Sequence, residues 1–259
     1  MGSKRSDRRK FLKGSAALVG GLLGAAAPAI GQTPTSPAMI KGDKNQIAYG
    51  DRSRFETSVR IPHGGRPSPD AFGLVFHVAA PLQDSVGMIT PSSLHFVGTT
   101  RGSYIPEIDP REHRLMIHGM VDRPLTFTVE DLKRFPSVTR PHFMECAGNR
   151  TSRRAKTVQE SHGMTSCAEW TGVLLSVLFK ECGVKSGATW FVAEGSEEVK
   201  GASSIPLAKG MDDCFVAYGM NGEALRPQNG FPLRLMVPGF EGIFHTKYLR
   251  RIKVWTGTT

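Results

Sequence analysis

The stretch His-Phe-Met-Glu-Cys-Ala-Gly-Asn-Arg at residues 142–150 joins an apolar run to a turn. The run up to Cys146 predicts a strand, and Gly148 with Asn149 predicts the turn that follows it. A cysteine in this place exposes its sulfur, and the small residues after it let a large group approach the backbone. Four cations follow, which we expect to lower the pKa of the thiol and to attract anions: Arg150, Arg153, Arg154 and Lys156.

Three roles fit Cys146. A thiolate is a good ligand for a soft or high-valent metal, and since only one thiolate is offered, a cofactor would bring most of the other ligands. A buried structural cysteine beside a solvated basic face fits about equally well. A hydrolase nucleophile fits less well, because the sequence places none of the 8 histidines as its base.

The composition is that of a folded protein rich in loops and strands. Of 259 residues 39% are hydrophobic and 22% are charged, and 29 Gly with 17 Pro argue against a helical bundle. The chain has four cysteines but no C-x-x-C pair, which argues against zinc ribbons and thioredoxin-type redox sites. No G-x-G-x-x-G or P-loop supports a nucleotide fold. The other three cysteines are interpreted as core residues: Cys167, Cys182 and Cys214.

The first 31 residues are interpreted as a targeting peptide. They hold six cations and one anion, so much of the net charge of +10 lies there and the remainder does not indicate a nucleic-acid partner. Residues 7–13, Asp-Arg-Arg-Lys-Phe-Leu-Lys, resemble the twin-arginine export motif, which implies export of a folded protein to the periplasm. The apolar run at 14–27 is shorter than the roughly 18–20 residues of a spanning helix, so we expect no stable membrane anchor. The alternative is a basic tail that binds an acidic partner.

Strands and short helices are expected to interleave irregularly, giving an α+β fold of mixed sheets with short helices. We expect an extended arm at 32–91, one domain at 92–255 and a short tail at 256–259. Expected helices lie between Thr128 and Pro136 and from Leu174 to Gly183. Asn221-Gly222 predicts a hairpin turn. Expected strands lie at 72–78, 115–117, 142–146, 189–193, 215–220, 233–237 and 248–255.

Several blocks of the sequence resemble one family. Residues 143–150 resemble the molybdenum-binding cysteine motif of the sulfite oxidase family, and residues 157–173 are similar to its bacterial Sox-type sulfane dehydrogenase (sulfite dehydrogenase) branch. The resemblance runs from about Ser93 to Val254. Further matching blocks follow in order at 221–227, 230–234, 237–239 and 245–251.

The resemblance implies a molybdopterin-binding fold that carries Mo-molybdopterin, with Cys146 as metal ligand and catalytic residue and Arg150 as a second catalytic residue. It also implies a molybdenum-dependent periplasmic enzyme that oxidises sulfane sulfur or sulfite. Electrons would pass to a c-type cytochrome partner, since the chain has no C-x-x-C-H haem motif, and a sulfur-carrier protein is a possible second partner.

The resemblance also implies which residues contact the cofactor. Apart from the resemblance, Arg234 fits an outward residue on a strand and Lys247 a surface cation. The expected contacts are Phe96, Val97, Gly98, Thr99, Thr100, Cys146, Asn229, Arg234, His245, Thr246 and Lys247.

Three departures from the family pattern bear on the substrate and on the alternative function. The family often has an Arg and a His in the pterin-contacting segment that corresponds here to residues 96–100. No Tyr precedes Ser204-Ile205-Pro206, which argues against free sulfite as the best substrate. The chain also ends at Thr259, where the family begins a C-terminal dimerisation domain. The alternative is therefore a truncated, non-catalytic remnant that acts as a cofactor-free binding module.

Overall fold

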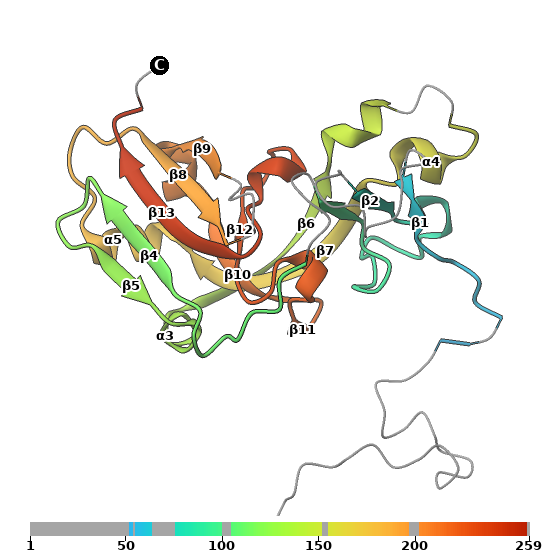
Figure 1. The fold of residues 1–259 in the computed structure, drawn as a ribbon, viewed down its shortest axis with the longest axis horizontal. Helices are drawn as coiled ribbons and strands as arrows, with labels where there is room; N and C mark the ends of the chain where they lie inside the picture. Colours follow the sequence, from blue (N-terminus) through green and yellow to red (C-terminus); the bar gives the residue numbers. More distant parts are fainter. Residues whose placement is uncertain are drawn as a thin grey trace, which may run out of the picture. The chain divides into compact units, whose positions relative to one another are not determined.

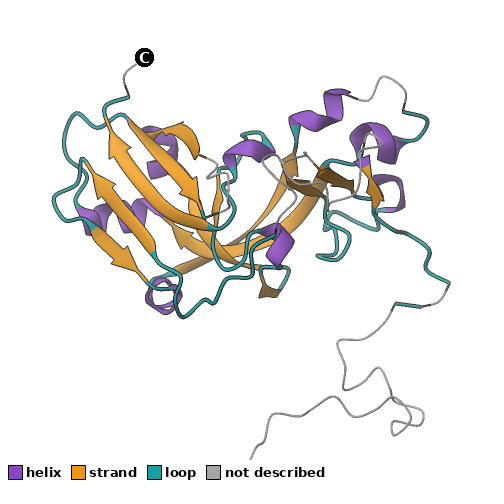
Figure 2. Cartoon of the chain, viewed as in Figure 1, coloured by secondary structure: helices purple, strands orange, loops and turns teal. Residues whose placement is uncertain are grey.

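The computed structural model confirms the α+β class. All the described helices and strands lie in the unit formed by Thr57–Thr259 (Figure 1), and among them strands outweigh the short helices (Figure 2). No helix in the described part of the chain is long and apolar enough to cross a membrane. The expected export signal at 1–31 lies outside the described residues, which are 52–53, 55–63, 76–99, 105–151, 155–196 and 202–257.

The described strands form three sheets. All pairs are antiparallel except β4 with β13. The first sheet has the order β1-β2-β3, with β1 at Ile61–Pro62, β2 at Phe76–Ala79 and β3 at Val97–Thr99. The second has the order β11-β10-β7-β6, and β12 also pairs with β10: β6 Ser137–Glu145, β7 Thr165–Leu174, β10 Phe215–Met220, β11 Glu223–Ala224, β12 Arg234–Met236. The third has the order β5-β4-β13-β8-β9: β4 Leu115–Gly119, β5 Leu125–Phe127, β8 Trp190–Gly195, β9 Ala202–Pro206, β13 Leu249–Trp255.

The helices are short, and the two that the sequence predicts are present. In α3 (Val129–Arg134) the Thr128 hydroxyl accepts from the Asp131 amide while the Asp131 carboxylate accepts from the Thr128 amide, which is a capping box. Gly183, at φ 69°, ends α5 (Leu175–Cys182) in the left-handed conformation that glycine adopts readily. The remaining helical segments are α4 Val158–His162, α6 Leu207–Asp212, and the 3₁₀ turns η3 Leu82–Asp84, η4 Ala147–Thr151, η5 Pro227–Asn229 and η6 Gly242–Phe244.

Two apolar clusters lie on opposite faces of the second sheet. In β10, Phe215 and Ala217 belong to one cluster and Val216 to the other, as the two-residue repeat of a strand requires. The larger cluster packs this sheet against the third sheet and α5. The smaller one surrounds Trp170 and includes Cys146. Strand β12 and most of β10 are therefore buried, so a side chain of β12 that points away from the larger cluster is still covered.

Two sequence expectations need correction. The strand expected at 142–146 begins at Ser137, because it pairs along its whole length with β7, a strand whose small and polar residues produce little apolar signal. Cys167 is only half-buried and is not a core residue, since it lies three positions from the buried Trp170 on a strand and so faces the other side. Cys182 and Cys214 are buried in the larger cluster.

Candidate active site

Cys146 follows the last residue of β6 and enters the turn η4. Its amide donates to Met164 O at 3.0 Å, its carbonyl accepts from the Asn149 amide at 3.0 Å, and the Gly148 amide lies 3.5 Å from its sulfur. The end of β6 therefore positions the cysteine, and the turn that follows places the Gly148 N–H next to its Sγ.

The side chain of Asn149 holds this turn against β7. Its Oδ1 accepts from the Met164 amide at 3.0 Å, and its Nδ2 donates to Thr165 Oγ1 at 2.9 Å and to Glu145 Oε1 at 3.0 Å. Its carboxamide oxygen and both of its N–H groups are hydrogen-bonded within the protein, so the role of Asn149 in the motif is structural.

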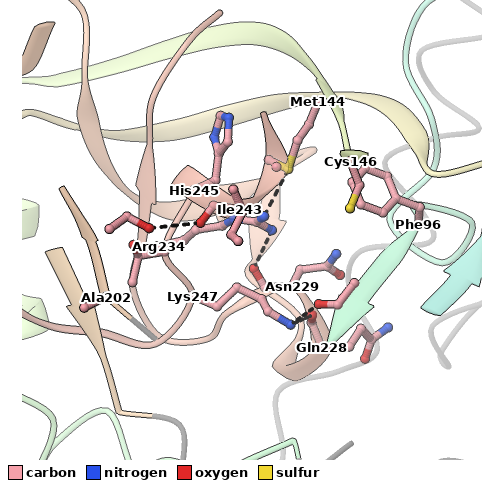
Figure 3. A pocket seen from close by; sticks show the side chains of 14 residues that line it. Phe96, Met144, Cys146, Ala202, Gln228, Asn229, Arg234, Ile243, His245 and Lys247 are labelled. Atoms are coloured by element: carbon pink, nitrogen blue, oxygen red, sulfur yellow. Dashed lines mark hydrogen bonds between the residues drawn. The ribbon is translucent and has the colours of Figure 1, made fainter. Parts of the chain in front are cut away.

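A cleft of about 730 Å³ opens beside Cys146 and draws residues from six separate parts of the chain (Figure 3). They come from the β3 region, the end of β6, β9, η5, β12 and the segment from η6 to β13. The lining residues are Phe96, Gly98, Met144, Cys146, Ala202, Ser203, Gln228, Asn229, Arg234, Gly242, Ile243, His245, Thr246 and Lys247.

Arg234 is a buried cation in this cleft. Leu233 and Leu235 face the larger cluster, so Arg234 points to the opposite face, where the smaller cluster covers it and leaves it 6% exposed. Its guanidinium donates to Asn229 O and to Met144 Sδ, each at 3.0 Å, and lies 5.2 Å from the Trp170 ring centre. No carboxylate among the described residues pairs with it. Burial lowers the pKa of Arg234 to about 10, so it is still charged at neutral pH.

Lys247 and His245 shape the floor of the cleft. The Lys247 ammonium donates to Gly98 O at 2.9 Å and to Gln228 O at 3.3 Å. These bonds link the segment just before β13 to β3 and η5. His245 Nδ1 accepts from the Val237 amide at 3.2 Å, so Nε2 carries the proton and donates to Phe240 O at 3.2 Å. Burial and Arg234 lower the pKa of His245 to about 3, so this histidine is neutral and holds a loop.

Cys146 also lines a second cavity of about 580 Å³ on its other side. That cavity is lined by Phe143, Glu145, Cys146, Ala147, Gly239, Phe240 and Glu241. Burial raises the pKa of the Cys146 thiol, and Glu241 and Glu145 add to the rise, while the Gly148 N–H opposes it. The pKa of this thiol is thus raised where the sequence predicted a lowered value, because burial was not visible in the sequence.

The cleft fits the cofactor that the sequence implies. Two buried polar atoms on its lining, Asn229 Oδ1 and Arg234 Nε, have no hydrogen-bond partner among the described residues, and a pterin ring offers both donors and acceptors. The Arg234 guanidinium, which no described carboxylate neutralises, suits an anionic phosphate. Cys146 provides one thiolate, which suits a metal that brings most of its other ligands with it. The described residues hold no group of three or more His, Cys, Asp or Glu that could bind a metal ion.

The cleft brings together eight of the residues for which we expected cofactor contacts. Val97 and Thr99 do not line it, because in β3 the cleft lies on the side of Phe96 and Gly98 and the alternate side chains point away. Thr100, Arg153, Arg154 and the side chain of Arg150 lie outside the described residues. The eight are Phe96, Gly98, Cys146, Asn229, Arg234, His245, Thr246 and Lys247.

Of the other six lining residues, Ala202 and Ser203 belong to the stretch before Ser204-Ile205-Pro206 in which the family pattern places a Tyr. The remaining four were not anticipated as part of the site: Met144, Gln228, Gly242 and Ile243. Met144 lies two positions before Cys146 in the strand expected at 142–146, so the two-residue repeat was a signal that could have placed it. Gln228 precedes Asn229 directly. Gly242 and Ile243 carry no chemical signature in the sequence.

Comparison with known proteins agrees with this geometry. The family model of the oxidoreductase molybdopterin binding domain matches residues 102–258. The chain is 38% identical over 194 residues to a nitrate reductase [NADPH] of Phytophthora infestans, covering 69% of this chain and 21% of that protein. It is 36% identical over 200 residues to nitrate reductase [NADH] 1 of Arabidopsis thaliana, covering 69% of this chain and 22% of that protein. The chain thus spans about a fifth of the length of these relatives.

A solved structure extends the likeness further along the chain. The sulfane dehydrogenase SoxCD from Paracoccus pantotrophus matches with a TM-score of 0.70 and 33% identity, over 87% of this chain and 60% of that one. At this identity the likeness reaches beyond the bare fold. The matched domain, the thiolate at the strand end and the cationic cleft together show that the chain belongs to the molybdopterin-binding oxidoreductases of the sulfite oxidase family, with Mo-molybdopterin as its cofactor.

Proposed function

We propose that this protein is a periplasmic enzyme that oxidises reduced sulfur and passes the electrons to a c-type cytochrome. The observation that carries the substrate assignment is the wall of small side chains in the cleft beside Cys146. Ala202 and Ser203 line it, and Ser203 Oγ donates to Ile243 O at 3.2 Å. Such a wall admits a bulky, tethered substrate and offers little to grip a small dianion.

The roles of the chain's own residues follow from the cleft. Cys146 binds the metal, and when bound the cofactor supplies the two-electron chemistry. Arg234 would neutralise negative charge on the bound cofactor, and Asn229 Oδ1, which has no partner among the described residues, would accept a hydrogen bond from the pterin. Lys247 keeps β3 and η5 in place around it. The likeness to a sulfane dehydrogenase over 87% of the chain supports sulfane sulfur on a carrier protein as the substrate.

Steady-state assays of the molybdenum-loaded protein with a c-type cytochrome acceptor test this substrate. We expect kcat/KM for carrier-bound sulfane sulfur to exceed that for free sulfite by roughly tenfold or more. Without a Tyr before Ser204-Ile205-Pro206, free sulfite lacks one charge-assisted hydrogen bond, and such a loss costs about 1.5–3 kcal/mol. A higher kcat/KM for free sulfite would contradict the tethered substrate.

Nitrate reduction is the second candidate, favoured by the named nitrate reductases at 36–38% identity. The same preparation, given nitrate and a reduced dye, distinguishes it, because only the second candidate predicts turnover there. A protein that carries no molybdenum when made in a host with an intact cofactor pathway would support the cofactor-free binding module instead.

Export is tested through Arg8 and Arg9. Replacing both by lysine keeps the charge but removes the arginine pair, so we expect the precursor to stay in the cytoplasm. Fractionation and immunoblotting measure this, and Lys4→Arg with Lys10→Arg serves as a control at neighbouring basic positions. Normal delivery of the double-lysine variant to the periplasm would refute the export route.

A further inference from the structure

A histidine from the first sheet contacts the turn that carries Cys146. His63 follows β1, is 2% exposed, and its Nε2 lies 3.2 Å from Gly148 O, 85 residues away in the sequence. Because a carbonyl oxygen only accepts, Nε2 carries the proton and donates. Nδ1 of His63 is buried and has no partner among the described residues. Among the described residues, this imidazole is therefore hydrogen-bonded through Nε2, to Gly148 O.

A second histidine packs on the same glycine. A Cβ on residue 148 would lie 3.4 Å from His77 Nδ1 and 3.5 Å from Cys146 Sγ. The rings of His63 and His77 are 6.4 Å apart. Both histidines precede residue 102, where the match to the family model begins. The first sheet therefore encloses the cysteine turn with residues that the family model does not include.

The bond to Gly148 bears on the sulfur through the backbone of one residue. The Gly148 carbonyl accepts from His63, while the Gly148 amide points at Cys146 Sγ from 3.5 Å. Fixing the carbonyl fixes the conformation of a glycine, which has no side chain to restrain it. Hydrogen bonds to a metal-bound sulfur withdraw electron density from it and change the potential of the metal.

We propose that His63 is a positioning residue for the Cys146 sulfur, holding the Gly148 N–H against Sγ and thereby setting the electron density that the thiolate donates to molybdenum. This inference rests on the assignment of Cys146 as the metal ligand. Without the imidazole the turn relaxes, the N–H withdraws, and the thiolate becomes the stronger donor. The metal is then harder to reduce.

The chain offers a matched control for the loss of a buried histidine. His113 is also buried, and its Nε2 donates to a backbone carbonyl, Leu249 O, at 2.8 Å. It lies next to the third sheet and lines neither cavity at Cys146. Replacing either histidine by leucine removes a hydrogen bond from a buried imidazole to a backbone carbonyl. A difference between the two variants therefore comes from the place of His63 beside the Cys146 turn.

The experiment uses the full chain loaded with its cofactor, in the wild-type, His63→Leu, His63→Gln and His113→Leu forms. Molybdenum content, thermal unfolding, the Mo(V) electron paramagnetic resonance spectrum and the midpoint potential are measured for each. We expect His63→Leu to shift the g-values, to lower the potential and to lose about tenfold or more in turnover. Gln keeps a donor near the position of Nε2 and should restore most of the spectrum. His113→Leu should lose thermal stability but keep the wild-type spectrum and potential.

Wild-type g-values and potential in His63→Leu, with a loss of stability like that of His113→Leu, would overturn the proposal. If His63→Leu binds no molybdenum, cofactor-free proteins are alkylated with iodoacetamide and the rate at Cys146 is compared with that at Cys167. A ratio that differs from the wild-type value in His63→Leu, but not in His113→Leu, supports the proposal, and an unchanged ratio overturns it. If His63→Leu does not fold, His63→Asn, whose amide is too short to reach Gly148 O, replaces it. A wild-type protein without a molybdenum signal would instead refute the proposed function.

Discussion

Replacing Cys146 with serine is expected to abolish turnover while most of the pterin stays bound. The thiolate is the protein's ligand to the metal, whereas the polar groups that suit the pterin and its phosphate lie elsewhere in the cleft, at Asn229 and Arg234. Losing several kcal/mol of metal-dependent stabilisation corresponds to a fall in kcat of roughly a thousandfold or more.

Turnover, pterin fluorescence after release and molybdenum content are measured on the same preparation. Cys167→Ser is the matched control, because Cys167 is a half-buried free cysteine on β7 that lines neither cavity. The control should retain activity. Wild-type turnover in Cys146→Ser would remove this sulfur from the reaction, and complete loss of the pterin would show that the thiolate anchors the cofactor as well.

Replacing Arg234 with methionine is expected to have opposite effects on cofactor binding and on the stability of the cofactor-free protein. The lowered pKa of about 10 corresponds to a burial cost of about 3 kcal/mol for the charged form. That cost is present at neutral pH and fades as the pH rises through the folded-state pKa. Methionine removes it but loses the bonds to Asn229 O and Met144 Sδ. A net gain of about 1 kcal/mol would raise the Tm by roughly 2–4 °C.

The same variant should bind the cofactor poorly, because a buried guanidinium aimed at an anion contributes about 1.5–3 kcal/mol, or roughly ten- to a hundredfold in affinity. Molybdenum and pterin contents of protein made with the cofactor, and Tm of protein made without it, measure the two effects. Arg234→Lys keeps the charge and loses the planar fork, so it should retain the instability and recover only part of the binding. Full cofactor content in Arg234→Met would contradict the role of this residue.

Local patterns in the sequence were sufficient for the elements whose signals come from neighbours in the chain. The apolar residues of 215–220 and the Asn221-Gly222 turn predicted β10 and its hairpin, and both central turn residues have positive φ. Thr128 with Asp131 and Gly183 predicted the ends of α3 and α5. The ordered blocks around Cys146 and Arg234 were specific enough to indicate the family and the cofactor.

Burial and long-range contacts could not be predicted in this way. The apolar neighbours Leu233 and Leu235 predict that Arg234 points to the opposite face of the strand, and the sequence alone predicts that this face is exposed to water. Only the tertiary structure places the smaller cluster there, which turns an outward arginine into a buried cation. The same burial reverses the expected pKa direction of Cys146. His63 reaches Gly148 across 85 residues, because the path of a chain between distant segments is set by how sheets pack, and no periodicity within a single strand or helix carries that information.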